Sequence, residues 1–176
     1  FRRVLFRSIL SAPHIREALE PFFQEHPDIV LDGELYNHDL KNDFEKIISL
    51  VRKSKPTAAD LAESKKLVQY HVYDMIEQTG KWSFTDRYDF IEDELFDYPS
   101  VFVVKITIAD NEQHIMENLS WNLEAGYEGQ MLRVPKSLYE GKRSKNLIKH
   151  KEFEDDEFQI VSIEEGKGNW AGAAKR

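Results

Sequence analysis

The sequence predicts an α+β fold in which mixed and antiparallel sheets are flanked by helices. Segments typical of strands alternate with segments typical of helices, and the varied lengths of their connections argue against a doubly wound parallel sheet. Apolar residues make up 41% and charged residues 32% of the chain, as in an ordinary globular protein. A length of 176 residues is enough for one domain, or for one domain and part of a second.

Helices are expected where apolar residues recur every three or four positions and a capping or breaking residue marks an end. Pro13 suits the first turn of such a helix, and Ser83 with Asp86 forms a capping pattern for another. The expected helices cover residues 11–25, 42–53, 58–66, a segment that begins after Ser83, and 111–124. The expected strands lie between them, at residues 28–36, 68–76, 101–109 and 127–134.

The charge balance and the absence of cysteine exclude several classes of protein. Twenty-four basic and 32 acidic residues give a net charge of −8, which excludes a uniformly basic nucleic-acid coat protein but not a local basic patch. Without cysteine there is no disulfide scaffold, thiolate zinc site, iron–sulfur cluster or cysteine nucleophile. No apolar run approaches the roughly 20 residues of a membrane span, and nothing resembles a signal peptide, so we expect a cytoplasmic protein with no membrane partner.

The composition changes sharply near residue 152. Residues 136–151 hold six Lys or Arg and one acid, whereas residues 152–165 hold seven acids and no Lys or Arg. We therefore expect a domain boundary here, followed by a strand at 158–163 and a glycine-rich turn at 166–172. At the other end, residues 1–8 contain three Arg and no acid and do not begin with Met, and we interpret them as a foreign or damaged end in preference to a functional basic arm.

Two short segments place polar groups on apolar strands. Asp32-Gly33-Glu34 interrupts an apolar run, and carboxylates there cost free energy unless they bind a metal, a sugar hydroxyl or a cation, or unless the strand end is partly exposed. Tyr73 precedes Asp74 on the next expected strand, where strict alternation puts the two side chains on opposite faces. A tyrosine in such a place can stack on a nucleobase, although taken alone a core aromatic is the better interpretation.

Two further segments carry charge in an alternating pattern. In the segment 128–133, alternation puts Glu128 on the side of Gln130 and puts Met131 on the side of Arg133, and Gly129 would let a ligand or a backbone approach closely. A salt bridge at a strand end is the alternative. Lys149 and Lys151 face the same side of a strand, and two ammonium groups held together favour an anion such as a phosphate over a merely solvated basic strand.

Taken in order, these segments resemble the motifs of the covalent nucleotidyltransferases, and specifically of ATP-dependent DNA ligases of phage or bacterial type. That family carries K-x-D-G with the nucleophilic lysine, an Arg-bearing element, D-G-E, an aromatic-Asp strand, E-G-x-M-x-R and L-x-K-x-K. The last four resemble Asp32-Gly33-Glu34, Tyr73-Asp74, residues 128–133 and residues 147–151. The resemblance covers nearly the whole chain from about Ser11, and residues 158–170 resemble the start of the OB-fold domain that follows in ligases.

The resemblance implies a nucleotidyltransferase domain of ATP-grasp-like fold that uses ATP and Mg²⁺ on nicked double-stranded DNA. The family's chemistry is lysine adenylation, transfer of AMP to a 5′-phosphate, and attack by the 3′-hydroxyl, and it serves DNA repair, replication and recombination. The implied site residues are Tyr73 and Met131 around the adenine, Glu34 near the ribose or metal, Glu128 on the metal, Lys149 and Lys151 as catalytic residues on the α-phosphate, and Arg143, Lys145 and Lys167 on DNA.

The sequence departs from the family pattern in one decisive place. No K-x-D-G occurs, because the one Asp-Gly, at residues 32–33, has Val30 where the lysine would stand. We therefore expect the nucleophile and the Arg-bearing element upstream, and no self-adenylation by this chain. The expected organisation is an anomalous end at 1–10, a partial adenylation domain at 11–153 and the incomplete start of an OB-fold domain at 154–176.

Other functions are compatible with parts of the pattern. An RNA ligase or an mRNA-capping guanylyltransferase would share the motifs. A glycosidase could use Glu34 and Glu128 as a carboxylate pair, but it leaves Lys149 and Lys151 without a role. A non-catalytic nucleic-acid-binding module could be built on residues 136–151. We expect a monomer from the cytoplasm of a bacterium or a phage-infected cell.

Overall fold

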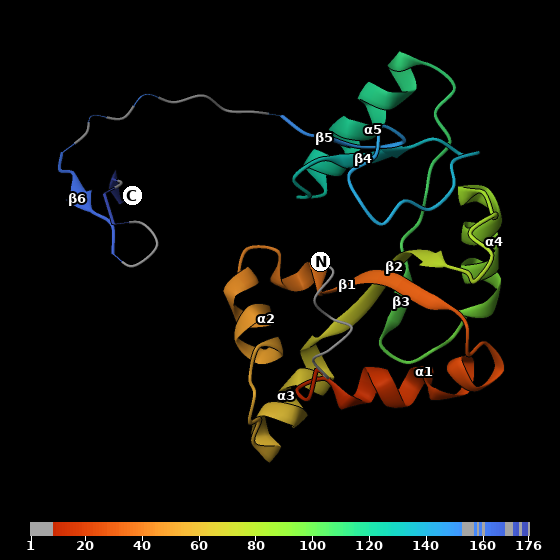
Figure 1. Ribbon diagram of the computed structural model, residues 1–176, viewed down its shortest axis with the longest axis horizontal. Coiled ribbons are helices and arrows are strands. Elements are labelled where there is room, and N and C mark those ends of the chain that lie inside the picture. Colours follow the sequence, from red (N-terminus) through yellow and green to blue (C-terminus); the bar gives the residue numbers. More distant parts are fainter. Residues whose placement is uncertain are drawn as a thin grey trace.

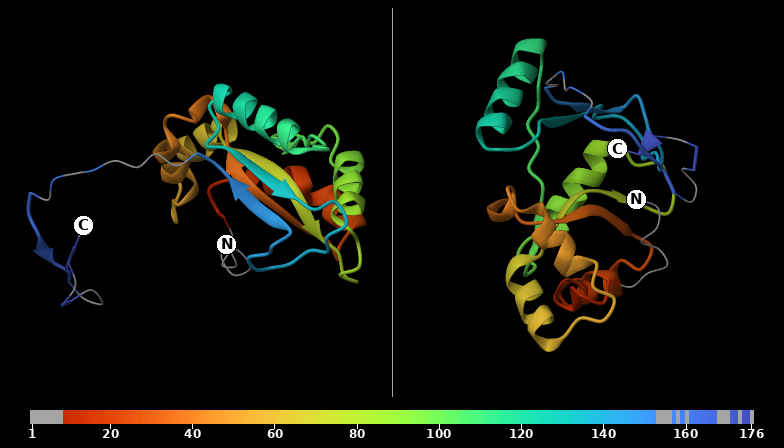
Figure 2. Two further views of the ribbon diagram at one scale, coloured as in Figure 1. Left: turned by 90° about the horizontal axis from the view of Figure 1, so that it is seen from above. Right: turned by 90° about the vertical axis from the view of Figure 1, so that its left-hand side faces the viewer.

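The computed structural model describes residues 9–152, 157, 159, 161–167, 171–172 and 174–175. The described elements confirm the α+β prediction, with a mixed sheet, two antiparallel strand pairs and helices around them (Figure 1). The larger sheet has the order β1-β2-β3, and a second sheet is formed by β4 and β5. Figures 1 and 2 show the β4–β5 sheet lying over β1 and β2, with α1 on the opposite side of those strands.

The larger sheet joins β1 (Val30–Tyr36), β2 (Gln69–Ile76) and β3 (Val101–Val103). β1 and β2 are antiparallel, and β2 and β3 are parallel. Asp32 pairs with Asp74 and Gly33 pairs with Val72, so Tyr73 is the extra residue of a β-bulge. Gly33 is required at this bulge, because a Cβ atom there would lie 2.5 Å from the carbonyl oxygen of His71.

One hydrophobic core packs β2 against α1 (Pro13–Glu25) and α4 (Phe84–Glu94). The bulge explains why both Val72 and Met75, which are three residues apart, face this core. The members of this core cluster with at most 2% exposure are Phe22, Leu50, Val68, Val72, Met75, Ile91 and Leu95. Burial of this set fixes the position of β2, which carries two of the residues singled out by the sequence.

The first half of the chain is completed by η2 (His38–Leu40), α2 (Phe44–Val51) and α3 (Ala58–Leu67). Capping boxes at Thr57 and Ser83 begin α3 and α4, as the Ser83-x-x-Asp86 pattern predicts. In α2 the sequence predicts an apolar stripe formed by Phe44, Ile47, Ile48 and Val51, and this prediction is only partly correct. Ile47 and Leu50 are buried, whereas Phe44 is 48% exposed, because the core lies on the side of Leu50.

The second sheet pairs β4 (Gln130–Arg133) with β5 (Leu147–His150), and α5 (Glu112–Glu124) lies along its outer face (Figure 2). The expected strand at 101–109 is wrong beyond its first residues. After the bond from the Val104 N–H to the Val72 carbonyl, the described residues up to 110 have no strand partner, and Ile108 is 79% exposed. Apolar alternation alone is therefore not enough to make a strand here.

The C-terminal expectations are tested only in part. The described residues of the expected strand at 158–163, which are 159 and 161–163, are not in a strand. Two-residue strands instead pair at β6 (Glu164–Glu165) and β7 (Ala174–Lys175). Residues 1–8, the boundary at 153–156, and 158, 160, 168–170, 173 and 176 lie outside the described residues. Among the described residues, no helix is long and apolar enough to cross a membrane.

Candidate functional site

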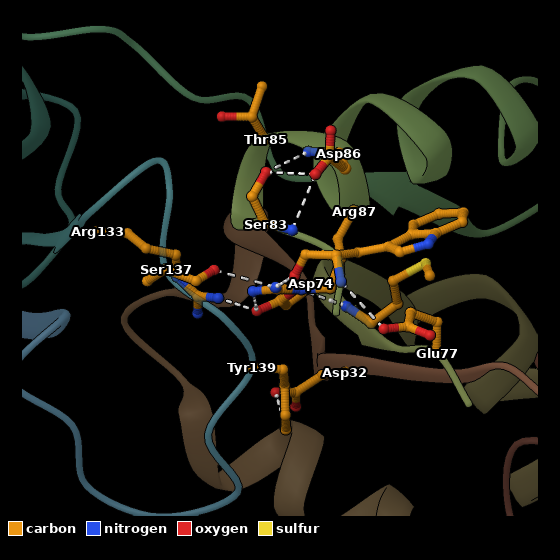
Figure 3. A network of polar contacts seen from close by, with 12 residues as sticks. Asp32, Asp74, Glu77, Ser83, Thr85, Asp86, Arg87, Arg133, Ser137 and Tyr139 are labelled. Carbon is orange, nitrogen blue, oxygen red and sulfur yellow. Dashed lines mark hydrogen bonds and ion pairs between the residues drawn. The ribbon is translucent and has the colours of Figure 1, made fainter. Parts of the chain in front are cut away.

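The two sheets are joined at one end by a buried group that we call the Asp74 contact (Figure 3). Its members are Asp74, Arg87 and Arg133, with the pair Asp32–Tyr139 beside them. Asp74 is fully buried; Arg87 reaches it with Nε at 2.6 Å and Nη2 at 3.1 Å, and Arg133 from β4 forms an ion pair with the same carboxylate. Tyr139 donates to Asp32 at 2.8 Å, and burial together with this bond to Asp32 raises the pKa of Tyr139, so the phenol stays a donor.

At the other end, segments that flank the two sheets meet in an exposed group that we call the His38 contact. Its members are His38, Lys41, Ala125 and Tyr127. The ring of His38 stacks on Tyr127 with the centroids 4.4 Å apart, and His38 Nε2 and Lys41 Nζ lie 3.0 and 2.7 Å from the Ala125 carbonyl oxygen. This contact attaches the segment between α5 and β4 to η2 (His38–Leu40), which follows β1.

Glu34 and Tyr73 lie on the larger sheet between these two contacts. Tyr73 is 38% exposed, and burial and the negative charges of Asp32 and Glu34 raise its pKa to about 12, so the phenol is neutral at ordinary pH. Arg133 is close enough to Tyr73 to act on its charge and also pairs with Asp74. The expectation that Tyr73 and Asp74 face apart is therefore wrong, because the bulge at Tyr73 breaks the alternation.

On the second sheet, four of the predicted residues lie together. Met131 pairs with Lys149 across the strands, so their side chains share one face, and Lys149 Nζ lies 2.7 Å from Glu128 Oε2. The hydrogen bond from Lys149 and the charges of Lys149 and Lys151 lower the pKa of Glu128. Both lysines therefore act on one carboxylate, in agreement with the prediction that they face the same side.

The two faces of β4 can be told apart by their contacts. Gln130 donates to the Ile115 carbonyl on α5 at 2.7 Å, whereas Arg133 points to Asp74 on the larger sheet. Met131 shares the face of Arg133, as predicted. Glu128 was expected on the face of Gln130 but bonds to Lys149, because Gly129 at φ 152° takes a conformation that favours glycine and interrupts the alternation.

Not all predicted residues are brought together. Arg143 and Lys145 are exposed in the loop before β5, and Lys167 is exposed in a different segment, after β6. A small pocket beside the Asp74 contact is lined by Asp32, Arg133 and Tyr139 among others, but not by Glu34, Tyr73, Met131 or Lys149. A single pocket lined by all of the predicted nucleotide-binding residues stays a prediction.

Six residues of the two contacts were not predicted from the sequence: Arg87, Tyr139, His38, Lys41, Ala125 and Tyr127. Arg87 lies within an expected helix, where nothing marks one cation as buried. The partners Asp32 and Tyr139 are 107 residues apart. The one sequence feature that could have pointed to any of these residues was the position of His38, two residues after the expected strand that carries Glu34.

The chain resembles known proteins in sequence and in fold. Residues 3–151 match the family described as "ATP dependent DNA ligase domain". The chain is 26% identical over 152 residues to a DNA ligase of Haemophilus influenzae, covering 85% of this chain and 53% of that protein. It is 28% identical over 151 residues to a DNA ligase of Natronomonas pharaonis, covering 81% of this chain and 26% of that protein. The chain thus spans about half or less of the curated relatives it matches.

Solved structures agree with this match. A structure described as "DNA binding with a minimal scaffold: Structure-function analysis of Lig E DNA ligases" is 27% identical with a TM-score of 0.66, over 82% of this chain and 54% of that one. A structure named Pmar-Lig_PreS3 shares the fold, with a TM-score of 0.68 at 23% identity over 93% of this chain and 40% of that one. On the family match over residues 3–151, the chain belongs to the ATP-dependent DNA ligase domain family.

Proposed function

We propose that this chain forms the ATP-binding part of the adenylation domain of a DNA ligase. The observation that carries the proposal is that the Asp74 and His38 contacts hold the β4–β5 sheet over β1 and β2. Tyr73 and Glu34 belong to one side of this arrangement, and Met131 and Lys149 belong to the other. A neutral tyrosine and a flexible thioether are suited to the two faces of an adenine ring.

Lys149, Lys151 and Glu128 are proposed to bind the phosphates and the metal. The carboxylate of Glu128 is 75% exposed, which leaves space for the water ligands that Mg²⁺ keeps when one or two carboxylates hold it. A phosphate would take Lys149 away from Glu128, and the metal would take its place beside Glu128. Glu34 is proposed to lie near the ribose or the same metal. When bound, Mg²⁺ supplies charge neutralisation at the phosphates.

DNA is proposed to bind through Arg143, Lys145 and Lys167. These cations are exposed and can contact phosphates without any change in the fold. The partner we propose is nicked double-stranded DNA. The family match and the pairing of Glu128 with Lys149 favour this function over a glycosidase that would use Glu34 and Glu128 as its carboxylate pair.

We further propose that the chain of 176 residues binds ATP without forming a covalent lysyl-AMP. No lysine stands two residues before its Asp-Gly. Lys149 and Lys151 serve as charge partners, and a protonated amine cannot attack the α-phosphate.

Calorimetry with ATP and Mg²⁺ and intact-mass spectrometry test both parts. We expect measurable binding, and Lys149→Ala should weaken it about ten-fold or more, because a hydrogen bond to a charged group contributes about 1.5–3 kcal/mol. Lys66→Ala, which replaces an exposed lysine on α3, is the matched control.

Metal binding is tested separately with Mn²⁺. Glu128→Gln should reduce Mn²⁺ binding, whereas Glu94→Gln should not, although Glu94 lies with Glu25 and His26 in another group of potential ligands. A stable adduct of one AMP, or equal ATP affinity of Lys149→Ala, would contradict the proposal.

A further inference from the structure

Arg87 lies at the centre of the Asp74 contact, although it is not part of any motif that the sequence analysis singled out. Its side chain is 1% exposed and comes from the first turns of α4. Its Nε and Nη2 atoms hold the two oxygens of Asp74, at 2.6 and 3.1 Å. This two-point geometry fixes the plane of the Asp74 carboxylate, which a lysine could not do.

Arg133 uses the carboxylate that Arg87 has oriented. Arg133 pairs with Oδ2 of Asp74, and its guanidinium carbon lies 4.5 Å from the ring centroid of Phe84 at the start of α4. Arg87 also donates through Nη1 to the carbonyl of Ser137 at 3.2 Å, just after β4. The end of β4 is therefore held both through its side chain and through its backbone.

The proposed adenine-binding residues lie directly beside this group. Tyr73 precedes Asp74 on β2, and Met131 is two residues before Arg133 on the same face of β4. The length of the link from Asp74 to Arg133 therefore sets how far apart β2 and β4 lie at this point. Any loosening of that link changes the space available between Tyr73 and Met131.

We propose that Arg87 is a positioning residue that acts through Asp74 and Arg133 to set the separation of Tyr73 and Met131. The inference rests on the proposed function, because it assigns those two side chains to adenine. Arg87 itself touches no nucleotide in this scheme. Its contribution is the fixed geometry of Asp74, and a purely stabilising residue would not control that separation.

The experiment measures the separation of the sheets and the binding of the base independently. The chain has no cysteine, so Ile76→Cys and Ile148→Cys, at exposed positions on β2 and β5, give two unique spin-label sites for pulsed dipolar distance measurement. Arg87→Lys keeps the positive charge but loses the planar guanidinium that bonds both oxygens of Asp74. Arg133→Gln, at a side chain that is 14% exposed, cuts the link while Arg87 and Asp74 stay paired in the core. Arg52→Lys and Arg52→Gln, at the exposed end of α2, are the matched controls.

We expect a narrow distance distribution in the parent and the Arg52 variants, measured well below the unfolding temperature. Arg87→Lys and Arg133→Gln should broaden it and weaken the binding of both adenosine and ATP by an equal factor of about ten, because the base site and not the phosphate site is changed. Unchanged width and affinity in the folded Arg133→Gln variant would overturn the inference. If the parent binds neither adenosine nor ATP, the proposed function fails, while the distance data alone still decide whether Arg87 and Arg133 set the separation of the sheets.

Discussion

The two contacts that join the sheets differ in burial and in chemistry. The Asp74 contact is a buried anion shared by the buried guanidinium of Arg87 and the largely buried guanidinium of Arg133, whereas the His38 contact is a ring stack with hydrogen bonds to one exposed carbonyl. A buried charge that loses its partners is strongly destabilising, whereas exposed polar contacts contribute little net free energy. One end of the arrangement is therefore fixed, and the other can open at low cost.

This difference assigns different tasks to the two ends. Under the proposed function, Tyr73 and Met131 lie near the fixed end, where a planar base would need a constant separation. Glu128 lies toward the other end, next to Tyr127 in the sequence, and the ammonium group of Lys149, whose backbone pairs with Met131, reaches it there. The proposed phosphates and metal would enter and leave on this side. In the proposed site, the buried Asp74 contact would keep the adenine side rigid, and the exposed His38 contact would let the phosphate side open.

The largest expected effect comes from removing the anion of the Asp74 contact. Asp74→Asn leaves the buried guanidinium of Arg87 and the largely buried guanidinium of Arg133 facing a neutral amide, so we expect the free energy of unfolding to fall by about 3–5 kcal/mol. Urea unfolding followed by circular dichroism measures it. Asp110→Asn, whose side chain is 77% exposed, is the control and should change little. A loss in Asp74→Asn no larger than in the control would mean that the buried contact does not hold the fold.

A smaller effect is expected from acid pH, through the turn that leads into α4. Burial alone would raise the pKa of Glu77, but its carboxylate accepts bonds from Thr79 and from the backbone N–H groups of Trp82 and Lys81, which together lower its pKa from 4.5 to about 2. Since the folded-state pKa is depressed, the stabilisation is present above pH 4.5 and is lost as the pH falls toward 2.

Glu77→Gln should lack this part of the pH dependence. We expect its melting temperature to lie below that of the parent by about 2–4 °C near neutral pH, and the difference to shrink as the pH approaches 2.5. Differential scanning fluorimetry between pH 2.5 and 7 measures it. Asp60→Asn, in the capping box of α3, is a useful comparison because hydrogen bonds from Lys53 and Thr57 also lower the pKa of Asp60, to about 2, but far from the Asp74 contact. If the melting temperatures of Glu77→Gln and the parent differed by the same amount at every pH, Glu77 would not be the source of this pH dependence.

Local features of the fold were predictable because a few neighbouring residues determine them. Ser83 with Asp86 begins α4, and the apolar period of 13–25 yields α1. The length of β3 was not predictable, because a strand also needs a partner for its backbone, and after Val104 none is present in the described part of the chain. Alternation also failed at Tyr73 and at Gly129, where a bulge and a positive φ reset the faces.

The candidate site likewise contains residues that could be predicted from the sequence and residues that could not. Glu128, Lys149 and Lys151 were found because their spacing matches a family pattern, and the structure places their charges together. Arg87 and Tyr139 were not found, because their importance lies in burial and in partners that are distant in sequence. Sequence patterns thus identified groups that could contact a ligand, together with Asp74 and Arg133 of the Asp74 contact, but not Arg87 and Tyr139, which complete that contact.

The smallest expected effect belongs to the His38 contact, and it is the one that tests the comparison most directly. His38→Ala removes the stack on Tyr127 and one of the two bonds to the Ala125 carbonyl, while Lys41 keeps the other. We expect the free energy of unfolding to fall by only about 0.5–1 kcal/mol, as for one exposed hydrogen bond and its packing. Amide hydrogen exchange should nevertheless become faster at residues 125–129 and stay unchanged at residues 130–133, because the Asp74 contact still holds that end. Tyr36→Phe removes only the 2.9 Å bond between the phenol and His38 Nδ1 and serves as the control, with a smaller change at the same amides. If His38→Ala instead accelerates exchange equally at both ends of β4, the two contacts open as one unit, and the distinction between a fixed end and an opening end is wrong.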